Sequence, residues 1–333
     1  MSWFAGLIPN TNFLFRKLKI NLSLDFGSSQ TRLIVNHKLV WDQPTVIAWH
    51  TGLQVVVAVG NKAAALRGKT PAYIKLINPI QRGVVAELDY AVYYLRAVLD
   101  ELQQQKKISP WLLAYCGTAL PVNASPLEKE QMRQVLERVG FKVKKIVSKT
   151  EVVASLPSFK KITQSHGVID FGAETVDVGI FIGQQLLKGF NINGVVGNTF
   201  TQTIIDQVLT EYELQISWGV AQQIKHQLST SSMMTVRGKD AQLGLVKVTR
   251  VEAKIFEQHF ISLMESLLSE LNIVINELPP EVMTQLQEQG FYLTGNGSQL
   301  LGWQDLIKKN LQMPVIISTS PALDVVKGLD YGE

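Results

Sequence analysis

The segments LSLDFGSSQTRLIV (residues 22–35) and GVIDFGAETVDVGIFI (residues 167–182) share one pattern. Each is an apolar, β-rich run followed by Asp-Phe-Gly, three small or polar residues and a second β-rich run. This order predicts a strand, a turn that contains glycine and a second strand. Asp25 and Asp170 stand 145 residues apart, which is close to one domain length. We therefore predict two copies of one domain plan, whose acidic residues and free main-chain N–H groups face a shared cleft.

The segments around these hairpins alternate between helical and strand patterns. Apolar residues recur at helical spacing over residues 88–102, and Ser125 with Glu128 forms a capping-box pattern for a helix that Gly140 ends. We expect further helices over residues 200–212, 220–228 and 251–277 and from about Pro321. Strands are expected over residues 143–147, 291–294 and 315–318. The sequence therefore predicts a mixed α/β fold.

The composition excludes several classes of protein. The 333 residues suit about two domains, and 46% apolar content suffices for sizeable cores. A net charge of +4 with only 18% charged residues gives no sign of a nucleic-acid partner. The single cysteine, Cys116, cannot form an intrachain disulfide or a cysteine zinc site, so we expect a reducing, cytoplasmic location. No apolar run approaches the roughly 18 residues that a membrane-spanning helix needs.

The first 15 residues carry no charged side chain and are followed by Arg16, Lys17 and Lys19. An export signal has its cations before the apolar stretch, so this order argues against export. It suits a peripheral anchor in which apolar side chains enter the acyl boundary and the cations meet anionic headgroups. The anchoring residues would include Trp3, Phe4, Leu7 and Ile8. A disordered or core-packed tail is the alternative.

Few motifs in the sequence indicate a particular catalytic or binding chemistry. The chain has no G-x-x-x-x-G-K and no G-x-S-x-G motif, and its five histidines lack metal-ligand spacing. What remains is a set of turns rich in small residues, at residues 25–31, 170–177 and 294–298, whose main-chain N–H groups could meet phosphates. Asp25 and Asp170 could hold Mg²⁺ through water. Taken singly, each turn is more often an ordinary hairpin.

Taken together and in order, these blocks resemble the actin-like ATPases, and among them the bacterial MreB family. Residues 25–31 match the first phosphate hairpin of that family, and residues 58–89 (AVGNKAAALRGKTPAYIKLINPIQRGVVAELD) match a stretch specific to MreB. Residues 149–154 (KTEVVA) stand where the family has E-E-P-x-A-A. Later blocks at residues 236–240, 278–281 and 293–297 follow in register. The resemblance runs from about Ile20 to Leu329.

The resemblance implies an actin-like ATPase fold of two related α/β domains, with accessory subdomains, around a nucleotide cleft. The first domain would span residues 20–155, with a small subdomain at about 46–84. The second would span residues 156–321, with a small subdomain at about 198–261. Residues 1–19 would form a membrane-targeting tail, and residues 322–333 a C-terminal helix that returns to the first domain.

The resemblance also implies a function: binding of ATP or ADP with Mg²⁺, and self-assembly into filaments on the inner face of the cell membrane. Such filaments organise cell-wall synthesis and rod shape. The expected partners are other copies of the chain, an anionic membrane surface and cell-wall synthesis and morphogenesis proteins, with no nucleic acid. A small-molecule kinase on the same fold is disfavoured, because no substrate domain is added.

Site residues follow from the same resemblance, position by position. Asp25 and Asp170 would organise Mg²⁺ and water, Glu151 would orient the attacking water, and Thr175 would assist it. The remaining residues would contact the nucleotide: Ser28, Ser29, Gln30, Gly172, Ala173, Glu174, Thr175, Gln222, Gln223, Ile224, Lys225, Gly295, Asn296, Gly297 and Ser298.

Several departures from the family pattern leave hydrolysis open. The second hairpin lacks two glycines of D-x-G-G-G-T-T-E, and Glu174 stands among the replacements. If Glu174 faces the cleft, its charge opposes each phosphate charge by about 4 kcal/mol at about 4 Å and an effective dielectric of about 20; if it faces outward, binding is merely weaker. Val152 replaces a proline, and Gln222 and Gln223 replace carboxylates. The chain is thus at most a slow Mg²⁺-dependent ATPase, and the alternative is a pseudo-ATPase scaffold.

Overall fold

The computed structural model describes residues 19–108, 113–228, 230–300 and 302–331. The expected anchor residues Trp3, Phe4, Leu7 and Ile8 lie outside the described residues. No helix in the described ranges is long and apolar enough to span a bilayer.

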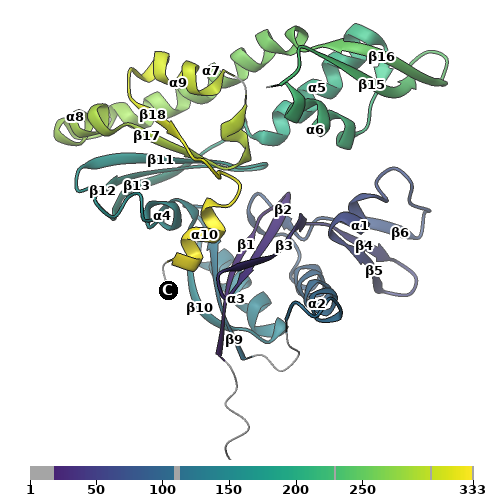
Figure 1. The fold of residues 1–333 in the computed structure, drawn as a ribbon, viewed down its shortest axis with the longest axis horizontal. Coiled ribbons are helices and arrows are strands. Elements are labelled where there is room, and N and C mark those ends of the chain that lie inside the picture. The colour runs from purple at the N-terminus through teal and green to yellow at the C-terminus, as the bar shows by residue number, and fades with distance from the viewer. Residues whose placement is uncertain (1–18, 109–112, 229, 301, 332–333) are drawn as a thin grey trace, which may run out of the picture.

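Two five-stranded sheets form the centres of two lobes, drawn one above the other in Figure 1. The first has the order β10-β9-β1-β2-β3 and the second the order β13-β12-β11-β17-β18. The first sheet consists of β1 (Lys19–Phe26), β2 (Gln30–Val35), β3 (Lys38–Pro44), β9 (Leu113–Leu120) and β10 (Lys142–Ser148). The second consists of β11 (Ser165–Phe171), β12 (Val176–Ile182), β13 (Gln185–Ile192), β17 (Phe291–Thr294) and β18 (Val315–Ile317).

The two sheets are built on the same plan. In each, three consecutive strands form an antiparallel meander, and the first of them pairs in parallel with a later strand, which pairs in parallel with the last. The equivalent first strands are β1 and β11, which end at Asp25-Phe26 and Asp170-Phe171. The prediction of two strand–turn–strand copies of one plan is confirmed.

Helices cover the outer faces of the sheets. Buried apolar residues of α2 (Leu88–Gln104) and α3 (Pro126–Val139) pack against the first sheet. The predicted capping box of α3 is present, and Gly140 ends the helix in the left-handed region at φ 104°. Several helices share the core of the second lobe: α5 (Gly197–Tyr212), α6 (Trp218–Gln227), α7 (Lys254–Asn276), α8 (Pro280–Gln289) and α9 (Trp303–Leu311).

A third core lies between the two sheets. It joins apolar residues of β9, β11 and β12 to the helices α4 (Lys149–Ala154) and α10 (Asp324–Tyr331). The chain passes between the lobes here twice, from α4 into β11 and from β18 into α10. The two helices approach closely, because a Cβ placed on Gly328 of α10 would lie 2.3 Å from the carbonyl oxygen of Val152 in α4.

Each lobe also carries a small three-stranded sheet, and both project to the same side in Figure 1. The first lobe has β4 (Ile47–His50), β5 (Val55–Val59) and β6 (Ile74–Ile77) with α1 (Gly60–Ala64), followed by the hairpin β7 (Ile80–Gln81) and β8 (Val84–Val85). The second has β14 (Leu214–Gln215), β15 (Met233–Asp240) and β16 (Val246–Glu252) with α6 (Trp218–Gln227).

Most predicted elements lie within a few residues of their expected bounds. The main difference is the helix expected over residues 251–277, which begins at Lys254. The preceding residues belong to β16, where valines alternate with polar residues and pair with β15. Alternation of this kind favours a strand over a helix. The last helix begins at Asp324 rather than near Pro321.

Candidate functional site

The hairpin between β1 and β2 contributes the first wall of the site. The N–H of Gly27 donates to the carbonyl oxygen of Gln30 at 3.1 Å, and a Cβ on Gly27 would lie 2.8 Å from that oxygen. The Ser28 hydroxyl accepts a hydrogen bond from the N–H of Gly83 at 2.8 Å. The turn is therefore compact and is fastened to the β7–β8 hairpin beside it.

The hairpin between β11 and β12 contributes the opposite wall. Its turn is closed by the N–H of Gly172, which donates to the carbonyl oxygen of Thr175 at 2.8 Å. The carbonyl oxygens of Gly172 and Ala173 accept from the N–H groups of Gly197 and Asn198 at the start of α5. Two N–H groups of that helix terminus are thus bonded to the hairpin.

The turn after β17 completes the site. Gly295 has φ 76°, in the left-handed region that favours glycine. A Cβ there would lie 2.5 Å from both Oδ1 of Asp170 and the carbonyl oxygen of Phe171. The following residues, Asn296–Gln299, form a 3₁₀ turn. Only glycine allows this turn to lie directly against the second hairpin.

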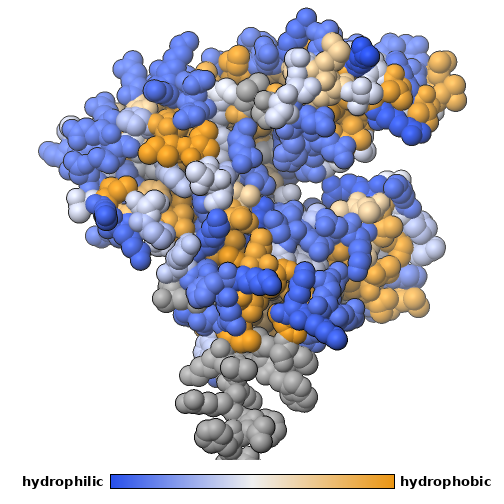
Figure 2. Space-filling model, in the orientation of Figure 1, coloured by the Kyte–Doolittle hydropathy of each residue, from blue (hydrophilic) through white to orange (hydrophobic). Residues whose placement is uncertain are grey.

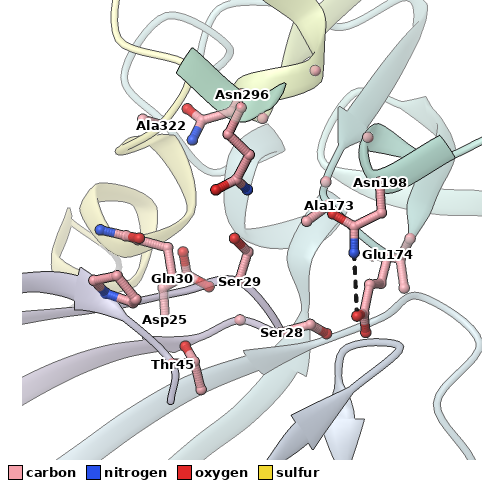
Figure 3. Close-up of a pocket in the computed structure, with 18 of the residues that line it drawn as sticks. Asp25, Ser28, Ser29, Gln30, Thr45, Ala173, Glu174, Asn198, Asn296 and Ala322 are labelled. Carbon is pink, nitrogen blue, oxygen red and sulfur yellow. Dashed lines mark hydrogen bonds between the residues drawn. The ribbon is translucent and has the colours of Figure 1, made fainter. Parts of the chain in front are cut away.

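A cavity of about 540 Å³ lies among these three turns. Figure 2 shows an indentation between the two lobes, and Figure 3 shows side chains from both hairpins and from Asn296 facing it. A volume of this size is typical of small-molecule and cofactor sites. Most of the predicted site residues line it: Asp25, Ser28, Ser29, Gln30, Asp170, Gly172, Ala173, Glu174, Thr175, Gln222, Lys225, Gly295, Asn296 and Gly297.

Four predicted residues do not line the cavity. Ile224 belongs to the apolar core of the second lobe, and Ser298 is fully buried, with its hydroxyl donating to the carbonyl oxygen of Gly295. Gln223 is also absent from the wall, because α6 turns Gln222 and Lys225 toward the cavity instead. The fourth is Glu151.

Glu151 is exposed and serves as a helix cap. Its carboxylate accepts from the N–H of Ser148 at 3.2 Å and from the Ser148 hydroxyl, which closes a capping box at the start of α4. Glu151, which was expected to orient the attacking water, thus bonds to the start of its own helix and is not among the residues that line the cavity. Lys149 is the residue of this segment that reaches the cavity.

The two aspartates expected to organise a metal ion are each paired with a basic side chain. Asp25 Oδ2 lies 3.5 Å from Nη1 of Arg32, and Asp170 Oδ2 lies 3.8 Å from Nζ of Lys149. All four residues are buried. Burial raises the pKa of Asp170 to about 7, although the Lys149 ammonium acts in the opposite direction. Burial lowers the pKa of Lys149, but the carboxylates of Asp170, Asp177 and Asp25 outweigh it, so the net direction is upward and the ammonium stays charged.

This arrangement does not fit Mg²⁺. A magnesium ion binds carboxylate oxygens directly or through water and is favoured where the carboxylates carry uncompensated charge. Here each carboxylate already faces a cation, although Arg32 also pairs with Asp42, whose Oδ1 lies 3.2 Å from Nε of Arg32. Two unit positive charges about 4 Å apart repel by about 4 kcal/mol at an effective dielectric of about 20. The repulsion between a divalent ion and the cation of Arg32 or Lys149 at that distance would be twice as large. The expectation of Mg²⁺ on Asp25 and Asp170 is therefore not supported by the residues present.

Glu174 lies in the cavity wall, and each oxygen of its carboxylate accepts a hydrogen bond. Its Oε2 accepts from the N–H of Arg82 at 2.7 Å, and its Oε1 accepts from Nδ2 of Asn198 at 3.3 Å. Figure 3 shows Glu174 between Asn198 and the side of the cavity that holds Ser28. The carboxylate therefore faces the cavity and also links the β7–β8 hairpin of the first lobe to α5 of the second.

Lys225 is a partly buried cation at the other end of the cavity. Its ammonium donates to the carbonyl oxygen of Gly197 at 2.9 Å and to the hydroxyl of Thr201 at 2.7 Å. Burial lowers the pKa of Lys225 to about 8. With Arg32, Arg67 and Lys149, it gives the wall four lysine or arginine side chains, against three carboxylates. The balance favours an anionic ligand.

Sequence reasoning missed Arg32 and Lys149. Arg32 had a usable signal, because a hairpin with a turn at residues 27–29 places residue 32 directly opposite residue 25, as the observed register does. Lys149 had none, since it meets Asp170 only through packing of α4 against β11. Thr45, Asn78, Asn198, Trp218, His226 and Gln299 also line the cavity without having been predicted.

Comparison with known proteins agrees with this architecture. A family model described as MreB/Mbl protein matches residues 19–332. The chain belongs to the MreB/Mbl family. A curated relative, the cell shape-determining protein Mbl of Bacillus subtilis (strain 168), is 25% identical over 311 residues, covering 90% of this chain and 92% of the relative. The cell shape-determining protein MreB of Escherichia coli (strain K12) is 23% identical over 331 residues, covering 92% and 91%.

Solved structures of MreB/Mbl relatives and of MamK show the same fold. MreB5 of Spiroplasma citri bound to AMPPNP superposes with a TM-score of 0.86 at 21% identity, covering 95% of this chain and 96% of that one. A chain of the MamK double helical filament superposes with a TM-score of 0.75 at 19% identity, covering 93% and 97%. The expected actin-like ATPase fold is confirmed.

Proposed function

We propose that this chain is a nucleotide-binding, filament-forming actin homologue that determines cell shape. The observation that carries the proposal is the cavity between two lobes of one plan, walled by three turns of small residues and by an excess of basic side chains. Membership of the MreB/Mbl family supports it. So do the relatives, because MreB5 is described as bound to AMPPNP or ADP, and MamK as a double helical filament.

Sedimentation and electron microscopy with ATP, with ADP and without nucleotide test this function. We expect polymer whose amount depends on the nucleotide. Absence of polymer under all three conditions, from protein shown by circular dichroism to be folded, would refute filament formation.

The proposal extends to a position at the inner face of the cell membrane and a role in organising cell-wall synthesis. The uncharged apolar residues 1–15, followed by three cations, support it, with Trp3, Phe4, Leu7 and Ile8 as membrane contacts. Deletion of residues 1–15 should release the protein from vesicles that contain anionic lipid while polymerisation persists. A second variant replaces Arg16, Lys17 and Lys19 with glutamine and leaves the apolar residues in place, which separates the electrostatic part of the membrane contact from the apolar part. If the deleted protein still sediments with vesicles, the membrane contact lies elsewhere, for example at Trp111.

A pseudo-ATPase scaffold is the second candidate, and the position of Glu151 favours it. The carboxylate expected to orient water caps α4, and an ammonium, that of Lys149, reaches the cavity in its place. An ammonium cannot act as a base toward water while it stays protonated. Phosphate release should therefore be very slow and equal in wild type and Glu151→Ala. A large decrease in the variant would assign Glu151 a role in turnover and exclude the scaffold.

A further inference from the structure

Two buried cations stand beside Asp25 and Asp170, the residues that were expected to organise a metal ion. Arg32 projects from β2 of the first lobe, and Lys149 stands at the first position of α4. Their side chains are only 10% and 9% exposed, yet both line the cavity. Each belongs to an ion pair with an aspartate that ends the first strand of a lobe.

These cations make ion pairs but leave hydrogen-bonding capacity unused. Nη1 of Arg32 lies 3.5 Å from Oδ2 of Asp25, and Nε lies 3.2 Å from Oδ1 of Asp42, an ion-pair contact that forms no hydrogen bond, so Nε is buried without a hydrogen-bond partner among the described residues. Lys149 lies 3.8 Å from Asp170 and makes no hydrogen bond within the described part of the chain. Buried N–H donors are normally satisfied, and an unsatisfied one marks a place where a further acceptor would be stabilising. Phosphate oxygens are acceptors of the required charge.

Arg32 and Lys149 lie in one cluster of charged groups, so both could contact the same ligand. The Lys149 ammonium interacts electrostatically with Asp170, Asp177, Asp25 and Arg32, so the groups from both lobes form one cluster. Asp177 stands behind the wall, where its carboxylate accepts from the N–H of Val122 and from Asn191. The cluster faces the space between the two hairpins, where a chain of phosphates would lie.

We propose that Arg32 and Lys149 take the place of the divalent cation, so that this chain binds a nucleoside di- or triphosphate without Mg²⁺. The inference rests on the proposed nucleotide site and specifies its charge compensation. Side-chain cations neutralise phosphate charge without the octahedral water shell that Mg²⁺ retains. Asp25 and Asp170 then hold the two cations in position rather than a metal ion.

The test is an equilibrium titration of the full-length protein with a fluorescent ADP analogue, in excess Mg²⁺ and in excess EDTA. For the wild type we expect dissociation constants that agree within about threefold, which is about 0.7 kcal/mol. A loss of more than about thirtyfold in EDTA would overturn the inference and leave the nucleotide site intact. Absence of binding in both conditions would instead refute the proposed function itself.

Charge-removing variants sharpen the test. Arg32→Gln with Lys149→Gln frees both aspartates, so binding in EDTA should fall by about a hundredfold and Mg²⁺ should restore part of it. Lys247→Gln is the matched control, because it breaks an ion pair of 3.1 Å with Asp240 on the β15–β16 hairpin, away from the cavity. It should change neither titration. If the double variant does not fold, Lys149→Gln alone is compared with the control, and equal metal dependence in the two would contradict the inference.

Discussion

Replacement of Glu174 by glutamine tests whether the carboxylate of the second hairpin repels a bound phosphate. The carboxylate lies in the cavity wall and is held by the N–H of Arg82 and by Asn198. Glutamine has nearly the same size and keeps an oxygen that can accept from Arg82. The substitution therefore removes one negative charge and one of the two hydrogen-bond acceptors, the one that faces Asn198.

The size of the effect follows from the position of the charge. A carboxylate and one phosphate charge about 8 Å apart repel by about 2 kcal/mol at an effective dielectric of 20. Glu174 is partly exposed, so solvent reduces this to about 1 kcal/mol, which is about fivefold in affinity for each phosphate charge nearby. Glu174→Gln should raise the affinity for ATP analogues more than that for ADP, because the triphosphate carries the additional charge.

The assay is competition of a fluorescent ADP analogue by ADP and by AMPPNP, which avoids turnover. Glu277→Gln is the matched control, since Glu277 pairs with Lys188 at 2.7 Å outside the cavity wall. The weaker link between the lobes should also lower the midpoint of thermal unfolding in Glu174→Gln. If both nucleotides bind the variant and the wild type equally, the carboxylate does not act on a phosphate, and its role is confined to joining the lobes.

Three further changes have definite expected outcomes. Burial lowers the pKa of Lys225 to about 8, below its value in the unfolded chain, so the ammonium loses its charge and nucleotide affinity should fall as the pH rises through 8. The fold should become more stable from pH 8 to about 10, because the unfolded chain binds more protons in that range. Nucleotide and urea titrations at several pH values check both effects, and Lys225→Met should lose the pH dependence. Asp177→Ala should lower the free energy of unfolding in urea by about 2–4 kcal/mol, because it leaves Nδ2 of Asn191 and the main-chain N–H of Val122, both partly buried, without an acceptor. A loss below about 1 kcal/mol would contradict this. Gly295→Ala should lower the free energy of unfolding by at least about 2 kcal/mol and abolish nucleotide binding. Gly302→Ala is the control, because Gly302 shares the positive φ but has open space where a Cβ would lie, and it should lower the free energy of unfolding by only about 1 kcal/mol. Equal losses would show that the close approach at Gly295 carries no cost.

Local patterns in the sequence were sufficient for most of the fold. The Asp-Phe-Gly turns gave both central hairpins, and Ser125 with Glu128 marked the start of α3. Patterns of this kind act over a few residues, so the sequence displays them directly. The boundary between β16 and α7 was harder, because valines at residues 246–251 suit either a helix or a strand, and pairing with β15 decides between them.

The candidate site was less accessible to prediction. Ser148 and Glu151 have the spacing of a capping box, which is enough to turn the glutamate back onto its own helix, but resemblance to the family directed attention to catalysis instead. The side chain of Glu174 is oriented by contacts with Asn198 and Arg82, which are 24 and 92 positions away in the sequence. The side chain of Lys149 is oriented by Asp170, which is 21 positions away. Contacts over such distances depend on how the two lobes pack, which no local pattern records.

The two passages of the chain between the lobes restrict how the cavity can change shape. Because α4 and α10 lie in contact at Gly328 and Val152, the covalent connections run along one line at one side of the cleft. Sliding of one lobe over the other would separate these helices and expose their shared core, whereas rotation about that line preserves both. A ligand that draws the two hairpins together therefore sets a single angle, and the small sheets at the far ends of the lobes undergo the largest displacement.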